Sequence, residues 1–259
     1  MKISLFFNFV LLGLLLTFFS CKEPGCTDAN AINYDSEANE NDNSCLYSGS
    51  FNIDFRLVNG NKALSKYDTI ISQDYSFRLE KIKFYISNLQ LKSNNDNKFL
   101  SEVNLYDIDN TNSKSLTFDL EEGMYDSLYF DLGLNKEQNS TNPANYDVSH
   151  PLGLNQNTFW AMEPSSYIFV MIEGKIDTLV GDDYYPITYH LAHNDLLRNV
   201  AFEKPIEISF DNPSAITVDV DLSKIFDSID LSEELPHQST NNKLAQLLMD
   251  NFSNSFEIQ

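Results

Sequence analysis

The chain has 259 residues and a formal net charge of −21, with a sequence pI near 4.3. Because acidic residues occur along the whole chain, nucleic acid is excluded as an electrostatically bound partner. The same charge repels anionic lipid, so membrane attachment has to come from an acyl anchor. With 42% hydrophobic residues, the composition still supplies the core of one domain of roughly 200 residues beside a small N-terminal module.

The N-terminus carries an export signal. Lys2 precedes the apolar run "ISLFFNFVLLGLLLTFFS", which stops at Cys21. This pattern is typical of a secretory signal peptide and is too short and too early for a membrane-spanning helix. Ser20 and Cys21 provide the small residue and the thiol that a lipoprotein signal peptidase requires. We expect residues 1–20 to be removed and Cys21 to be lipidated; ordinary cleavage nearby, which would leave Cys21 as an odd thiol, is the alternative.

Two further cysteines, Cys26 and Cys45, remain in a chain that is expected to enter an oxidising compartment. We therefore predict a disulfide between them. That bond leaves no thiol for nucleophilic catalysis or for a thiolate metal site.

The expected module covers residues 21–48 and contains "GCTDANAINYDSEANENDNSCLY". This segment is similar to a motif that recurs in secreted, cell-surface proteins of Gram-negative bacteria. Asp28, Asp35 and Asp42 are oxygen donors at short spacings, which would suit calcium. The alternative is a disulfide-linked polar spacer whose carboxylates are solvated.

Alternation of apolar and polar residues dominates the part from residue 49 to 259 and predicts half-buried strands. Turn-forming Asn, Asp, Gly and Pro separate the strands, so we predict a mainly β, antiparallel sandwich-like domain. The nine predicted strand segments are "SFNIDFRLV", "YSFRLEKIKFYISNLQLK", "VNLYDI", "KSLTFDL", "DSLYFDLGL", "YIFVMIEGKI", "YPITYHLA", "PIEISF" and "AITVDVDL".

Helical patterns are confined to the end of the chain. A helix near residues 240–252 is predicted from the i, i+3, i+4 spacing of Leu244, Leu247, Leu248 and Phe252. "DLSKIFDSIDL" is compatible with a second, short helix. Residues 135–157 form a long irregular loop, a feature that is often functional in compact domains, and it leads into the single tryptophan, Trp160.

Several segments occur in the order found in one family. They are "FYISNLQL", "YDSLYFDLGL", "HPLG", "FWAMEPSSYIFVMIEG", "YHLAHN" and a terminal "H…A…DNF". On these motifs the chain resembles the MbnP-like lipoproteins over nearly everything after Ser50. The resemblance implies an exported protein that is lipid-anchored to the outer membrane or cell surface of a Gram-negative bacterium.

The resemblance also implies copper binding by a modified side chain. In the family the tryptophan of this strand is oxidised to kynurenine, which joins histidines at copper, and a di-haem cytochrome c peroxidase-like (MbnH-like) partner performs the oxidation. The matching positions here are Trp160, His190 and His237. An unmodified indole offers no useful lone pair, whereas kynurenine exposes an arylamine and a ketone.

The other candidate copper ligands depart from the family pattern. Met162 stands where the family often has an aromatic residue or a histidine, and its thioether favours Cu(I). His150 precedes a Pro-Leu turn in the long loop. His193 lies in a turn after the predicted strand, where the family more often has a glycine-led loop, and strand alternation would point it away from His190.

No catalytic motif is present: the sequence has no G-x-S-x-G, H-E-x-x-H, phosphate-binding glycine loop or C-x-x-C-H. We therefore expect no enzyme activity. Two functions remain open. One is a copper-binding lipoprotein for extracytoplasmic metal capture or buffering, with Trp160 oxidised. The other is a surface interaction or structural sandwich without metal, in which Trp160 stays intact.

Overall fold

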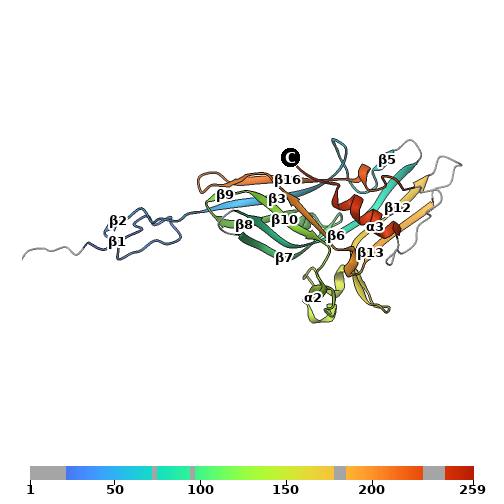
Figure 1. Ribbon diagram of the computed structural model, residues 1–259, viewed down its shortest axis with the longest axis horizontal. Coiled ribbons are helices and arrows are strands. Elements are labelled where there is room, and N and C mark those ends of the chain that lie inside the picture. The colour runs from blue at the N-terminus through green and yellow to red at the C-terminus, as the bar shows by residue number, and fades with distance from the viewer. Residues whose placement is uncertain (1–21, 72–74, 94–96, 178–184, 230–242) are drawn as a thin grey trace, which may run out of the picture. The chain divides into compact units, whose positions relative to one another are not determined.

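The computed structural model describes residues 22–71, 75–93, 97–177, 185–229 and 243–259 (Figure 1). The chain divides into two compact units after Ser48. The predicted signal peptide, Cys21 and His237 lie outside the described residues. Each unit is described by itself below.

The N-terminal unit is organised by its disulfide. Cys26 and Cys45 are bonded with a Cα–Cα distance of 4.8 Å, which confirms the predicted pairing. Two short parallel strands, β1 (Pro24–Gly25) and β2 (Glu40–Asn41), lie beside this bond. Cys26 and Ala31 are buried hydrophobic residues in the unit. A unit with so little apolar surface depends on its cross-link for order.

Carboxylates of this unit fix its turns. Asp28 accepts the backbone N–H of Asn30 at 2.9 Å through Oδ1 and the Tyr47 hydroxyl at 2.8 Å through Oδ2. These two hydrogen bonds hold the pKa of Asp28 below its ordinary value. Asp35 and Asp42 likewise accept backbone N–H groups two residues further on. Calcium binding by these carboxylates stays a prediction.

The first sheet of the main unit has eight strands among the described residues and contains Trp160 at one edge. The strands run along the path β11-β12-β6-β10-β14, with β13 paired to β12 and with β5 and β7 paired to β6. The strands are β5 (Thr69–Ile71), β6 (Ser76–Lys92), β7 (Asn97–Asp107), β10 (Ser127–Leu132), β11 (Phe159–Trp160), β12 (Ser166–Asp177), β13 (Tyr185–Ala192) and β14 (Arg198–Phe202).

The second sheet has five strands among the described residues, and a separate pair joins β9 to β15. The pairing of β3 with β16 is parallel, whereas the pairings of β16 with β17 and of β3 with β4 are antiparallel. The strands are β3 (Ser48–Asn59), β4 (Lys62–Ala63), β8 (Ser115–Glu121), β16 (Ser214–Asp221) and β17 (Phe256–Ile258), and the separate pair is β9 (Gly123–Tyr125) with β15 (Ile206–Ile208).

Aromatic side chains join the two sheets into one core. Phe55 of β3 meets Phe130 of β10 edge to face, with ring centroids 6.3 Å apart. Phe256 of β17 also contacts Phe130, at 5.2 Å. Such edge-to-face pairs add to the hydrophobic stabilisation of their burial. The predicted mainly β, sandwich-like architecture is confirmed.

The C-terminal helix, α3 (Lys243–Ser253), closes this core. Its Phe252 packs on Phe84 of β6 at 5.3 Å. The fully buried positions of α3 are Ala245, Leu248, Met249 and Phe252, so Leu244 and Leu247 are only partly buried, contrary to the sequence pattern. Ala245, which is small, and Met249, which is flexible, occupy buried positions of the helix that the sequence pattern assigned to Leu244 and Leu247.

Other helical segments are short. The predicted helix around residue 225 is a 3-10 turn, η5 (Leu222–Lys224), followed by further turns up to Ser228. The loop of residues 135–157 contains α2 (Lys136–Asn139), η2 (Pro143–Asn145) and η3 (Leu154–Gln156). Two further 3-10 turns are η1 (Thr111–Ser113) and η4 (Asn194–Leu196).

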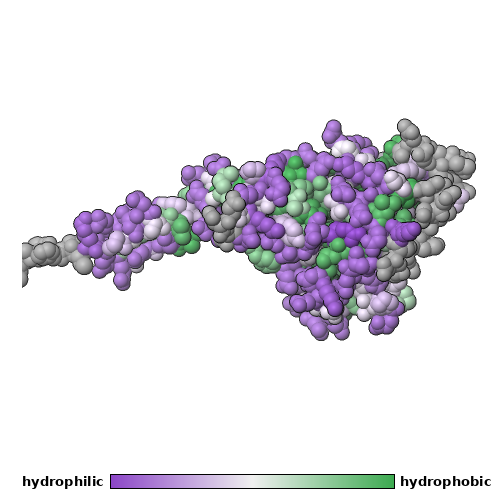
Figure 2. Space-filling model, viewed as in Figure 1, coloured by the Kyte–Doolittle hydropathy of each residue, from purple (hydrophilic) through white to green (hydrophobic). Residues whose placement is uncertain are grey.

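The surface agrees with the acidic composition. Figure 2 shows mostly hydrophilic side chains on the visible face, with apolar residues in small groups. In the part of the chain that the structure describes, no helix has the length and hydropathy needed to cross a membrane.

We predict that replacing Cys45 by Ser unfolds the N-terminal unit and leaves the main unit intact. A disulfide closing a loop of this length stabilises by roughly 3 kcal/mol, and the unit has little core to compensate for its loss. Limited proteolysis followed by peptide mapping measures the first effect, and calorimetry measures the second. Cleavage that stays as slow as in the wild type between residues 23 and 47 would refute the dependence on the bond.

Candidate functional site

The long loop that leads to Trp160 is fixed to the sheet by buried side chains. The Tyr85 hydroxyl of β6 donates to the Pro151 carbonyl at 2.9 Å and lies 2.6 Å from Thr158 Oγ1. Burial raises the pKa of Tyr85, which keeps the hydroxyl protonated as a donor. On β12, the Tyr167 hydroxyl donates to the Leu152 carbonyl at 2.9 Å. These hydrogen bonds therefore fix the end of the loop against β6 and β12.

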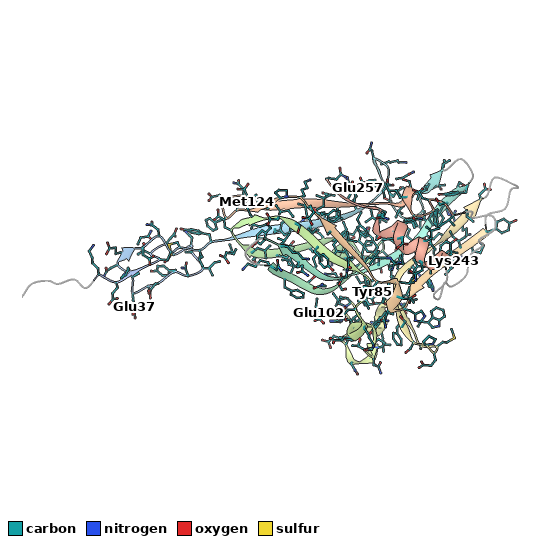
Figure 3. All side chains as sticks on the ribbon, in the orientation of Figure 1. Glu37, Tyr85, Glu102, Met124, Lys243 and Glu257 are labelled. Carbon is teal, nitrogen blue, oxygen red and sulfur yellow. A yellow bond between two sulfur atoms is a disulfide. The ribbon has the colours of Figure 1, made fainter. Side chains whose placement is uncertain are left out.

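Two further side chains connect this loop to strands β6 and β7. Lys83 of β6 donates to the Gln156 carbonyl at 3.0 Å and pairs with Asp107 of β7 at 2.8 Å. Gln138 of α2 donates to the Glu102 carbonyl of β7 at 3.1 Å. Tyr85 and Glu102, labelled in Figure 3, mark where the sheet meets the α2 loop.

Trp160 ends the two-residue strand β11 and is half-buried. Its register partner is Ser166, the first residue of β12. The indole Nε1 is buried and has no hydrogen-bond partner. A buried N–H group without a partner costs free energy, and Arg78 Nε is in the same state.

His193 is the histidine that lies beside Trp160. The two ring centroids are 6.4 Å apart, with an angle of 38° between the ring planes. His193 follows the end of β13 and precedes η4, and its backbone N–H donates to Ser166 Oγ at 3.0 Å. Strand alternation does not extend to this residue, because β13 ends at Ala192 and the backbone then changes direction.

The backbone of His193 is strained. Its φ of 85° and ψ of 152° lie in a region that suits glycine. A non-glycine residue there costs of order 1–3 kcal/mol and persists only where the surroundings enforce it. His193 thus holds a backbone conformation that glycine would adopt without strain.

His190 shares a sheet face with Trp160 but lies further along it. Ser166, the partner of Trp160, is two residues before Ile168, which pairs with Ala192. Ala192 is two residues from His190, and residues two apart in a strand share a face. This path covers four residue steps, about 13 Å along the strands. His190 is therefore not an immediate neighbour of Trp160.

The side chain of His190 has its own partners. Its Nε2 lies 3.0 Å from Glu173 Oε1, and Lys81 lies 3.3 Å from the second oxygen of Glu173. Burial alone would raise the pKa of Glu173, but the hydrogen bond from His190 and the charge of Lys81 lower it overall. The three residues form a row across β6, β12 and β13.

The remaining predicted ligands lie in different surroundings. His150 stacks on Tyr146 with ring centroids 4.3 Å apart, and its Nδ1 accepts the backbone N–H of Leu152 at 3.0 Å. Met162 lies in the turn after Trp160 and is 64% exposed, so its thioether is free to move. Among the residues described, no group of three or more His, Cys, Asp or Glu side chains could hold a metal ion.

A family model for MbnP matches residues 48–244. The chain belongs to the MbnP family. Among solved structures, MbnP from Methylosinus trichosporium is similar, with a TM-score of 0.58 and 13% identity, covering 82% of this chain and 98% of that chain. At this identity the likeness shows the fold. No curated protein matches the chain.

Membership of the MbnP family confirms the resemblance seen in the strand motifs. The matched range contains Trp160, His190 and His193, and it also contains His237, which lies outside the described residues. Sequence reasoning ranked His193 below His190 and His237. The sequence offered one signal, the place of His193 in the short turn directly after a predicted strand.

We predict that His193→Gly raises stability by about 1 kcal/mol, because glycine relieves the backbone strain at this position. Urea unfolding of the purified protein measures the change. His190→Gly is the matched control and should lower stability, because it places glycine within a strand. A stability loss of similar size in both variants would contradict the assignment of strain to His193.

We predict that Glu173 makes stability fall in acid. The pKa of Glu173 in the folded protein lies below its usual value of 4.5, so the unfolded chain takes up the proton more readily. Its contribution is present above pH 4.5 and is lost as the pH falls through the lowered folded value. Urea unfolding across this range should show a shallower pH slope for Glu173→Gln; an unchanged slope would contradict the prediction.

Proposed function

We propose that this protein is a copper-binding exported lipoprotein that captures or buffers copper outside the cytoplasm. The observation that carries the proposal is the contact of the only tryptophan, Trp160, with His193 in a chain of the MbnP family. The metal site requires that Trp160 first be oxidised to kynurenine.

The surroundings of Trp160 suit this oxidation. The residue is half-buried, so an external oxidant can withdraw electrons from the indole at short range. Its Nε1 has no partner in the folded chain, so no hydrogen bond has to break when the pyrrole ring opens. This nitrogen becomes the arylamine of kynurenine and is free to take a new partner.

The oxidation needs a co-reactant. The C2–C3 and N1–C2 bonds of the indole break, C2 leaves as formate, and three water molecules supply the added oxygen atoms. Four electrons and four protons are released, and a di-haem, cytochrome c peroxidase-like partner passes them to two molecules of peroxide, which become water. No residue of this chain is assigned a catalytic role in that reaction.

The donor set next to Trp160 fits copper when kynurenine is included. His193 supplies an imidazole, and the oxidised Trp160 supplies an arylamine and a ketone. Met162, two residues beyond Trp160, adds a soft thioether that stabilises Cu(I). His237 is a further candidate by its family position. Nitrogen and soft sulfur donors together favour copper over the other common divalent metals.

The leader sequence supports a location outside the cytoplasm for this chemistry. The signal peptide and the lipidated Cys21 would anchor the protein in the outer membrane or at the cell surface by acyl chains alone. The net charge of −21 keeps the protein itself from binding an anionic lipid surface. The charge also raises the local concentration of metal cations near the anchor.

We predict that protein isolated from its source cell carries a modified residue 160 and bound copper. Peptide mass spectrometry should show one carbon replaced by one oxygen at Trp160, and metal analysis should show copper that His193→Gln reduces. Recombinant protein made without the haem partner should keep the intact indole and bind copper more weakly. His237→Gln and His150→Gln serve as comparison variants.

An unmodified Trp160 without copper in the source-cell protein would overturn the proposal and favour the metal-free interaction module. Copper that is present but unaffected by His193→Gln would overturn the ligand assignment. Loss of copper in His150→Gln, with His193→Gln unaffected, would move the site to the loop around residue 150.

A further inference from the structure

Three segments that are distant in sequence meet at Ser166. Ser166 is fully buried at the start of β12 and is the register partner of Trp160. Its hydroxyl accepts the backbone N–H of His193 at 3.0 Å. The same hydroxyl lies 3.0 Å from Oδ1 of Asn139, the last residue of α2. Ser166 therefore connects the strand of Trp160, the turn of His193 and the long loop.

Asn139 is the second member of this cluster, which we name the Ser166–Asn139 hub. Its Oδ1 also accepts the backbone N–H of Tyr167 at 2.8 Å, and its Nδ2 donates to Asn194 Oδ1 at 2.9 Å. A backbone N–H group is always a donor, so the oxygen of Asn139 has to face Tyr167 and its nitrogen has to face Asn194. The orientation of the amide is fixed by this constraint.

The hub is attached to rigid structure on the side of the loop. Helix α2 has a capping box in which the Asn135 and Gln138 side chains satisfy each other's backbone N–H groups. Gln138 also donates to Glu102 of β7. Asn139 is 93% buried and thus cannot move without opening the loop from the sheet. The hydrogen bonds of the hub therefore fix the turn that carries His193 relative to the sheet.

The strained turn of His193 requires such support. A residue with φ of 85° relaxes toward negative φ unless neighbouring groups hold it. Two hydrogen bonds of the hub reach this turn, from His193 N–H to Ser166 Oγ and from Asn139 Nδ2 to the side chain of Asn194. Within the turn, the Leu196 N–H donates to the His193 carbonyl at 3.1 Å. We expect that removing either hub contact leaves the turn too weakly held to keep the positive φ, so that the imidazole moves away from the indole.

We propose that Asn139 and Ser166 are positioning residues that hold the imidazole of His193 against the side chain at position 160. Neither residue touches copper in this proposal. The effect on copper rests on the proposed function, whereas the effect on the two rings is a property of the folded chain alone. The two parts are tested by different measurements on the same variants.

The first measurement uses the single indole. Full-length mature protein labelled uniformly with 15N gives one indole N–H resonance beside its amide spectrum, because Trp160 is the only tryptophan. We expect nuclear Overhauser contacts between the Trp160 and His193 rings in the wild type. Ser166→Ala and Asn139→Ala should lose these contacts and shift the indole resonance, while the amide spectrum of the rest of the domain is retained.

Ser87→Ala is the matched control. Ser87 is also fully buried in the first sheet, and its hydroxyl donates to the Gly133 carbonyl at 2.8 Å, away from the hub. Asn139→Asp covers the case in which Asn139→Ala does not fold, because it keeps the acceptor for Tyr167 N–H and removes only the donor to Asn194. We expect Ser87→Ala to retain the ring contacts and Asn139→Asp to weaken them.

The second measurement is the copper(II) affinity of the same variants produced in the source cell, where residue 160 is expected to be oxidised, determined by titration against a chelator of known strength. Partners that orient a metal-binding histidine typically change metal affinity by about 10- to 100-fold, and we expect a loss in that range for Ser166→Ala and Asn139→Ala. Ser87→Ala should bind as the wild type does, even where its thermal stability falls. A purely structural role would lower stability in all three variants and leave affinity unchanged.

The outcomes separate the two proposals. Ring contacts that persist in Ser166→Ala and Asn139→Asp would overturn the positioning role. Ring contacts that are lost in these variants, with no copper binding by any form of the protein, would support the positioning role and overturn the proposed function. Loss of the contacts in Ser87→Ala as well would show a general loosening of the sheet and overturn the specific role of the hub.

Discussion

The hydroxyl of Ser166 is the contact on which the arrangement around Trp160 depends. It sits at the first position of β12, opposite Trp160, and accepts the N–H of His193. A buried hydroxyl of this kind is costly to desolvate unless it is fully hydrogen-bonded, and networks of such groups rigidify and specify one structure. The hydrogen bond from the His193 N–H to Ser166 Oγ and the bond from the Leu196 N–H to the His193 carbonyl hold the strained backbone in place.

The sandwich explains how a short strand can position a functional residue. Two residues of β11 could not hold an indole by their own pairing, since an isolated pair of strands is marginally stable. Tyr85, Tyr167 and Lys83 instead bind the carbonyls of the preceding loop. The aromatic core beneath keeps β6 and β12 in place. The position of residue 160 is thus fixed by side chains of the longer strands.

Alternation in the sequence predicted most of the fold. Long strands such as β6 and β12 bury one face or both, and their patterns are unambiguous. Short strands escaped prediction: β14 and β17 have three to five residues and are defined by their partners. The parallel pairing of β3 with β16 could not be predicted either, because alternation of apolar and polar residues looks the same whichever way a strand runs.

The site was only partly predictable. Trp160 was identified because it is the single tryptophan, but its neighbour was not. Alternation fails in β12, where a register shift between Ile168 and Val170 changes which residues share a face. It also fails at His193, where the strand has ended and φ is positive. Both features arise from tertiary hydrogen bonds that no local pattern encodes.

The proposed metal site joins residue 160 and His193. It can be tested with a crystal structure of the protein purified from its source cell, with anomalous diffraction measured at the copper absorption edge. We expect a copper peak between kynurenine 160 and His193, about 2.1 Å from an imidazole nitrogen. A peak at His190 or His150, or an intact indole with no peak near His193, would contradict it.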